Sequence, residues 1–85
     1  MNWDLIIDAT VRKQLKRIPR HEAMRIADAI KEMSVNPYAG DVEKMESEQG
    51  VWRRRVGSYR IFYEIITEKK LVYIFNIKRR TSKTY

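Results

Sequence analysis

Residues 51–66 read VWRRRVGSYRIFYEII, and this stretch decides the expected fold. Its two halves, 51–56 and 59–66, are rich in β-branched and aromatic residues and are separated by Gly57-Ser58. Such residues favour strands, and a two-residue connection with a glycine favours a tight hairpin. The stretch therefore predicts two adjoining antiparallel strands, whose side chains alternate between the two faces of a sheet.

Further strands are predicted on both sides of this hairpin. Apolar runs at 3–7 and 42–45 indicate two short strands, and the β-rich segment 71–77 indicates a long last one. The segments 59–66 and 71–77 are apolar partly on both faces, so we expect them to lie centrally in the sheet, under the helices.

Two helices are predicted between the first and second strands. Asp8 is a suitable N-cap for the first helix, whose apolar residues are Val11, Leu15 and Ile18, and Pro19 ends it. In the second helix apolar residues recur every three or four positions from Ala23 to Met33. The order β-α-α-β-β-β-β predicts an α+β fold, in which two N-terminal helices pack on a small, mostly antiparallel sheet.

The composition limits the class of protein. Eighty-five residues are enough for one domain, expected to span 1–85, and 44% hydrophobic with 34% charged residues is typical of a folded chain. There is no cysteine for a disulfide or a thiolate metal site. The sequence contains neither an apolar run of roughly 18 residues nor a signal peptide, so we expect a cytoplasmic protein.

The basic residues are concentrated in the second part of the chain. Residues 51–85 hold ten Lys and Arg against two acidic residues, a net charge of +8, whereas residues 1–50 hold eight against nine, a net charge of −1. Protein surfaces usually mix both signs. A cluster of one sign on strands predicts a site for a polyanion, RNA or DNA first, although solubilising charges that protect sheet edges are the alternative.

Strand alternation selects the side chains expected to form this site. Arg53 and Arg55 lie on one face of their strand, opposite to Arg54, and the short hairpin brings Arg60 onto the same face. The last strand is expected to end near Lys78. The predicted concave face therefore presents four arginines with an aromatic side chain alongside: Arg53, Arg55, Arg60, Arg79 and Tyr85. Guanidinium groups bind phosphates in a bidentate manner, and an aromatic ring stacks on an unpaired base.

Other chemistry is sparse in this sequence. His21 is the only histidine and is expected at the surface near the start of a helix. There is no glycine-rich phosphate loop, no paired-carboxylate arrangement and no metal-ligand spacing, so no metal or cofactor is predicted. Five large aromatic residues are expected mainly in the core: Trp3, Trp52, Tyr63, Tyr73 and Phe75.

Two segments, 52–65 (WRRRVGSYRIFYEI) and 74–85 (IFNIKRRTSKTY), resemble the signature of the RelE/ParE toxin superfamily. The resemblance extends over essentially the whole chain. It implies a small toxin of a type II toxin–antitoxin pair, in the RelE-like case an mRNA interferase that cleaves mRNA in the ribosomal A site. In that reaction the 2′-hydroxyl attacks the adjacent phosphate without a metal, giving a 2′,3′-cyclic phosphate and a 5′-hydroxyl.

The resemblance also implies roles for individual residues. Arg60 matches the arginine after the turn, Arg79 the arginine after the last strand, and Tyr85 the C-terminal tyrosine. Arg53 and Arg55 stand where RelE-like toxins usually have basic residues, often lysines. The implied catalytic residues are Arg55, Arg60, Arg79 and Tyr85, and the implied substrate-binding residues are Arg53, Lys78 and Arg80. Because an arginine stays protonated at ordinary pH, Arg53 and Arg55 are poor general bases.

The resemblance leaves two toxin activities and a simpler alternative open. A RelE-like toxin would act on the ribosome with its mRNA, whereas a ParE-like toxin would inhibit DNA gyrase without cleaving RNA. A non-catalytic basic protein that binds nucleic acid or ribosomes is the third reading. In either toxin case the expected partner is a cognate acidic antitoxin.

Overall fold

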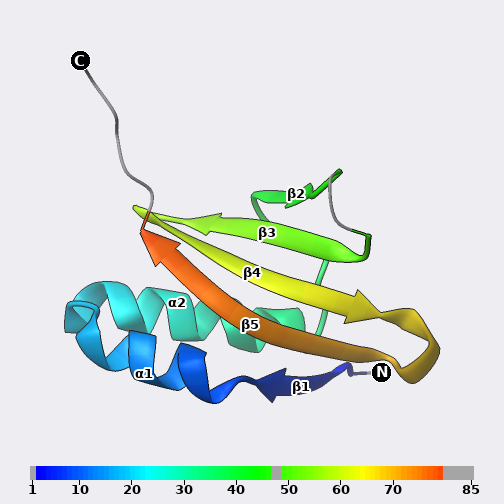
Figure 1. The fold of residues 1–85 in the computed structure, drawn as a ribbon, viewed down its shortest axis with the longest axis horizontal. Helices are drawn as coiled ribbons and strands as arrows, with labels where there is room; N and C mark the ends of the chain where they lie inside the picture. Colours follow the sequence, from blue (N-terminus) through cyan, green and yellow to red (C-terminus); the bar gives the residue numbers. More distant parts are fainter. Residues whose placement is uncertain (1, 47–48, 80–85) are drawn as a thin grey trace.

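The computed structural model describes residues 2–46 and 49–79, and its elements follow the predicted order (Figure 1). They are β1 (Asp4–Ile7), α1 (Ala9–Arg17), α2 (Arg20–Met33), β2 (Val42–Lys44), β3 (Val51–Val56), β4 (Tyr59–Ile66), a 3-10 turn η1 (Thr67–Lys69) and β5 (Leu71–Arg79). The last strand runs to Arg79, one residue beyond the end near Lys78 that the sequence predicts. No helix in this described part of the chain has the length and apolarity needed to cross a membrane.

The strands form one five-stranded sheet in the order β1-β5-β4-β3-β2. The pair of β1 and β5 is parallel, and the other three pairs are antiparallel. Figure 1 shows both helices against one side of the sheet, while the other side carries no helix. The predicted α+β fold, with two helices on a mostly antiparallel sheet, is therefore confirmed.

The core lies between α2 and the central strands. Along β4 buried and half-buried residues alternate strictly, and Ile61 and Tyr63 are fully buried on the helix side. The apolar stripe of α2 contributes Ile26 and Met33, which are also fully buried. Burial of these side chains, each worth about 1.5–3 kcal/mol, holds the helices on the sheet.

The hairpin between β3 and β4 has the geometry that its sequence predicts. Gly57 adopts φ 58°, in the left-handed region that a tight hairpin turn requires. Val56 pairs directly with Tyr59, so the two strands are in register from the turn onward. This register fixes which arginines of the hairpin share a face.

A β-bulge interrupts the pairing of β4 with β5. Phe62 pairs with Asn76 and Tyr63 pairs with Ile74, so Phe75 is an extra residue on β5. The bulge explains why Ile74 and Ile77, three positions apart, are both buried on the helix side. From this point to the end of β5, each side chain therefore lies on the face opposite to the one that strict alternation assigns.

A side chain of α1 stabilises this irregular segment. Gln14 donates from Nε2 to Asn76 Oδ1 at 2.8 Å and accepts at Oε1 from the Ile77 backbone N–H at 2.9 Å. These bonds satisfy polar groups of β5 beyond its pairing with β1, which ends at Ile74. Gln14 of α1 thus provides hydrogen bonds to β5 at the edge of the sheet, beyond the point where β5 stops pairing with β1.

Asp8 joins the start of α1 to the sheet. Its Oδ1 accepts from the Thr10 backbone N–H at 2.8 Å, so the predicted N-cap is confirmed, and its Oδ2 accepts from the Tyr73 hydroxyl. These hydrogen bonds, the one from Tyr73 first, lower the pKa of Asp8 below its ordinary value. The carboxylate is thus favoured in the folded state.

The variant Asp8→Asn is expected to be less stable at neutral pH and less sensitive to acid. A lowered pKa contributes stability above the unfolded carboxyl pKa of about 4, and this contribution is lost as the pH falls through the folded value. Asparagine still caps the helix but cannot offer the Tyr73 hydroxyl a charged acceptor. Thermal melts of wild type and variant from neutral to acid pH measure this, with the exposed Asp4→Asn as control. If the melting temperatures of Asp8→Asn and wild type fall equally as the pH is lowered, the prediction is contradicted.

Candidate functional site

Three cationic side chains lie side by side on the sheet face that carries no helix, called here the open face. Arg55 on β3 pairs with Arg60 on β4, and Arg60 pairs with Lys78 on β5. Residues directly opposite in an antiparallel sheet point to the same face, with strands about 4.8 Å apart. Arg55, Arg60 and Lys78 therefore form a row of positive charges across three strands, called here the cation row.

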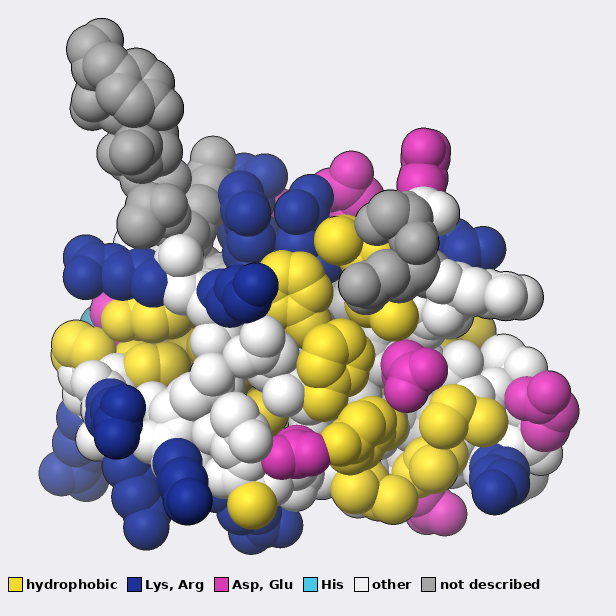
Figure 2. Space-filling model, viewed as in Figure 1, with side chains coloured by type: hydrophobic (Ala, Val, Ile, Leu, Met, Phe, Trp, Pro, Cys, Tyr) yellow, Lys and Arg dark blue, Asp and Glu magenta, His cyan; other side chains and the backbone are white. Residues whose placement is uncertain are grey.

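A second row runs beside the cation row and includes an aromatic ring. Arg53 on β3 pairs with Phe62 on β4, so both lie on the open face. The Lys78 Nζ lies over the Phe62 ring, 5.6 Å from its centroid, within the range of a cation–π interaction. Figure 2 shows Lys and Arg side chains gathered over this end of the sheet, where β5 ends. The open face thus combines cations with a half-buried ring at its centre.

The segment around β2 places two carboxylates against these cations. Glu43 forms an ion pair with Arg53, and the Asp41 Oδ2 lies 3.6 Å from the Arg55 Nε. Within residues 2–46 and 49–79, no carboxylate forms such a pair with Arg60 or Lys78. The Arg60 Nε is buried and has no hydrogen-bond partner among those residues. The centre of the cation row is therefore the part with the least compensated charge.

The structure corrects the predicted membership of the concave face. Arg53, Arg55 and Arg60 share a face as expected. Arg79 does not join them, because it pairs with Tyr59, which is buried on the helix side. The bulge at Phe75 is the physical reason, since it exchanges the faces of Lys78 and Arg79. Two further predicted site residues, Arg80 and Tyr85, lie outside the described residues.

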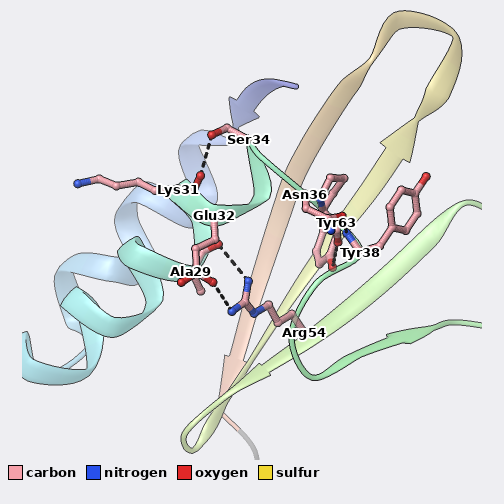
Figure 3. Close-up of polar contacts among 9 residues, drawn as sticks. Ala29, Lys31, Glu32, Ser34, Asn36, Tyr38, Arg54 and Tyr63 are labelled. Carbon is pink, nitrogen blue, oxygen red and sulfur yellow. Dashed lines mark hydrogen bonds and ion pairs between the residues drawn. The ribbon is translucent and has the colours of Figure 1, made fainter. Parts of the chain in front are cut away.

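The middle arginine of the hairpin has a structural role instead. The Arg54 side chain is 13% exposed and turns to the helix side, where NH2 donates to the Glu32 carboxylate at 2.7 Å and NH1 to the Ala29 carbonyl at 3.3 Å (Figure 3). A Cβ at Gly40 would lie 2.8 Å from the guanidinium carbon. Gly40 therefore leaves room for the Arg54 guanidinium, whose hydrogen bonds link β3 to α2.

The remainder of the open face carries aromatic and aliphatic side chains and a carboxylate, that of Glu64, which pairs with Tyr73. The Tyr73 and Phe75 rings lie 6.1 Å apart and are half-buried on this face, and Ile6 of β1 is 49% exposed beside Tyr73. Tyr73 and Phe75 are thus not core residues, contrary to the sequence prediction, whereas Tyr63 is. The open face has a cationic end and a mainly apolar end.

The chemistry available on the described part of this face is stabilisation of negative charge. Arginine and lysine there bind phosphate oxygens and stabilise charge that develops on them. Burial raises the pKa of Tyr63 to about 12, and its hydroxyl donates to the Pro37 carbonyl at 3.0 Å on the helix side (Figure 3). Tyr63 is therefore a structural residue. Sequence reasoning missed Phe62, although its position two residues after Arg60 assigns it to the same face.

Comparisons with known proteins give a consistent result. The sequence model of a family described as the ParE toxin of type II toxin-antitoxin system, parDE, matches residues 5–83. RelE1 of Methanocaldococcus jannaschii, which is named as a toxin, is 25% identical over 83 residues, covering 94% of this chain and 92% of that protein.

Solved structures agree with the sequence matches. A chain of the archaeal RelE-RelB complex from Pyrococcus horikoshii OT3 superposes with a TM-score of 0.85 at 25% identity, covering 98% of this chain and 100% of that one. The isolated E. coli RelE toxin has a TM-score of 0.80 at 16% identity, over 95% and 87% of the two chains, which is a likeness of fold alone. These matches confirm the resemblance found in the sequence.

Proposed function

The chain belongs to the ParE toxin family of type II toxin–antitoxin systems, and from this premise we propose that it is a RelE-like mRNA endonuclease. Its substrate would be mRNA in the ribosomal A site. The cation row carries this proposal, because like charges directly opposite each other on neighbouring strands destabilise a sheet, and an anion bound across them offsets this cost. A phosphate of the RNA backbone supplies such an anion.

The proposed reaction is a transfer of the phosphoryl group within the RNA. The 2′-oxygen forms a bond to the adjacent phosphorus, and the bond from phosphorus to the 5′-oxygen breaks. The products are a 2′,3′-cyclic phosphate and a 5′-hydroxyl, which gains the proton that the 2′-hydroxyl loses. No divalent metal enters this scheme, which follows the reaction that the family resemblance implies.

The residues of the open face have distinct proposed roles. Arg60, at the centre of the cation row, would bind the oxygens of the pentavalent phosphorus and stabilise their charge. Arg55 flanks it in the same role, and Arg53 and Lys78 would bind neighbouring phosphates. Phe62 offers a ring on which an unpaired base can stack.

Two residues beyond the cation row stay in the proposal on the strength of the resemblance: Tyr85 is proposed to contact the base next to the reacting phosphate, and Arg80 to bind the RNA backbone. Arg79 is not assigned to the reacting phosphate, because its pairing with Tyr59 places it on the face opposite to Arg60. Since arginine does not release its proton at ordinary pH, the base function falls to Tyr85 or to no protein group. If no protein group acts as the base, mRNA cleavage is expected to be slow.

A cognate antitoxin is the proposed protein partner. The related chain from Pyrococcus was solved in a RelE-RelB complex. The excess positive charge of this chain, +7 in total, favours an acidic antitoxin. The ribosome with its mRNA is the proposed target.

Inhibition of DNA gyrase remains the second candidate function. The observation that favours it is the family description, which names the ParE toxin. A supercoiling assay with gyrase tests this activity directly. Inhibition of gyrase by protein that leaves ribosome-bound mRNA intact would replace the proposed nuclease by this second function.

Primer extension on mRNA bound to programmed ribosomes tests the nuclease proposal. We expect cuts within the A-site codon, and much slower cutting by the variants Arg60→Ala and Tyr85→Phe. Lys69→Ala is the matched control, since Lys69 is an exposed cation in η1, at the end of the sheet away from the cation row. The absence of A-site cuts, or equal cutting by all variants, would contradict the proposal. Equally fast cutting of naked RNA would contradict the dependence on ribosomes.

A further inference from the structure

Two carboxylates lie on the open face in register with the arginines. Val42 pairs with Arg54 and Glu43 with Arg53, so the same antiparallel register places Asp41 opposite Arg55. The Arg55 backbone N–H donates to the Asp41 carbonyl at 2.9 Å, which continues the ladder to this position. Asp41 and Glu43 are two residues apart, and both point to the face that carries Arg53 and Arg55.

Each carboxylate is paired with an arginine expected to bind phosphate. Glu43 forms its ion pair with Arg53, and Asp41 forms one with Arg55. Figure 2 shows acidic side chains next to basic ones above the sheet, over β2 and β3. An RNA phosphate that binds Arg53 or Arg55 therefore meets a carboxylate already in place.

The carboxylates of these pairs are open to solvent. Both carboxylate side chains are 67% exposed, whereas the Arg55 side chain is 46% and the Arg53 side chain 25% exposed. Ion pairs in such positions are weak because water screens them. The edge strand β2 is only three residues long and is bonded to β3 alone within the sheet. A polyanion can thus replace the two carboxylates, but at the cost of part of its own binding energy.

We propose that Asp41 and Glu43 act as an internal competitor for RNA, which lowers the affinity of the open face for isolated single strands. This inference rests on the proposed function of that face. With both carboxylates in place, RNA contacts mainly Arg60 and Lys78 unless further contacts help to displace the pairs. A target that offers additional contacts, as a ribosome does, is then favoured over free RNA. Asp41 and Glu43 are specificity-determining residues in this scheme and take no part in the chemistry.

The double variant Asp41→Asn/Glu43→Gln tests the proposal through its salt dependence. Each phosphate contact to a single strand contributes about −0.7 to the slope of log K against log salt concentration. Release of two arginines is therefore expected to steepen the slope by about 1.4 and to raise affinity about tenfold at low salt. The measurement is fluorescence anisotropy of a short 2′-O-methyl oligouridine, which cannot undergo attack by a 2′-hydroxyl. Asp4→Asn/Glu68→Gln is the matched control, because it removes the same charge from exposed positions at the end of the sheet away from the cation row.

The outcomes separate this inference from the proposed function. If the salt slope of the double variant equals that of the control, the inference is overturned. A shallower slope also overturns it, and shows instead that the carboxylates hold the arginines in position for RNA. If wild type binds RNA through Arg60 while the carboxylate variants change nothing, the inference fails and the proposed function stands. If no variant binds RNA and none cuts mRNA on ribosomes, both fail. The single variants Asp41→Asn and Glu43→Gln, each expected to change the slope by about 0.7, provide the same test with less change to β2.

Discussion

The variant Arg60→Gln is expected to lose about 10²–10³-fold in the rate of mRNA cleavage while it melts no lower than wild type. Arg60 lies between Arg55 and Lys78, and like charges directly opposite on neighbouring strands destabilise a sheet. Its buried Nε has no hydrogen-bond partner among the described residues, which adds to the cost of placing it there. Removing the charge relieves repulsion in the free protein and removes the main stabiliser of the reacting phosphate.

Single-turnover cleavage on programmed ribosomes and thermal melts of the free protein measure the two halves of this prediction. Lys69→Gln serves as the control, since it removes one exposed cation away from the face. A loss of activity with a large drop in melting temperature would indicate that Arg60 mainly supports the fold. If cleavage is undiminished while the melting temperature rises, the charge of Arg60 adds to the repulsion in the cation row without contributing to catalysis.

The variant Ile61→Ala is expected to reduce the free energy of unfolding by about 2–5 kcal/mol. Ile61 is fully buried in the core on the helix side of β4, a central strand of the sheet. A domain of this size is stabilised by roughly 5–15 kcal/mol, so the loss is a large fraction of the total. The expected fall in melting temperature is about 8–40 °C, at about 4–8 °C per kcal/mol.

The matched control for this variant is Ile66→Ala, the same substitution at the far end of the same strand. Ile66 lies half-buried on the open face, opposite Leu71, and loses less burial on truncation. Urea unfolding followed by circular dichroism compares the two. Equal destabilisation would show that the open face of β4 is as important to stability as the helix side.

Much of the fold and of the site followed from local pattern. The hairpin of β3 and β4 was predictable because Gly57-Ser58 allows few turn geometries, and a tight turn leaves one register between its strands. That register placed Arg53, Arg55 and Arg60 on one face and Arg54 on the other, as the sequence predicted. The N-cap at Asp8 and the two helices were predictable for the same reason, since each depends on residues close together in the chain.

The sequence prediction was wrong at the end of the last strand. It expects the strand to end near Lys78, with Arg79 beyond it on the concave face, but β5 runs to Arg79, and the bulge at Phe75 puts Lys78 on the open face and Arg79 on the other. A bulge depends on partners distant in the chain, here Phe62 and Tyr63 across the sheet and Gln14 in α1. The burial of Tyr73 and Phe75 was overestimated for a related reason, because only the packing of the helices shows which side of the sheet is covered.

The sequence by itself determined that cations would collect on one part of a small sheet, because charge and strand alternation are properties of neighbouring residues. Only the tertiary structure decided which cations stand together and what opposes them. The bulge selected Lys78 over Arg79, and the pairing of β2 with β3 brought Asp41 and Glu43 onto the arginines. Both results depend on contacts between residues far apart in the chain, which form only when the sheet and helices pack together.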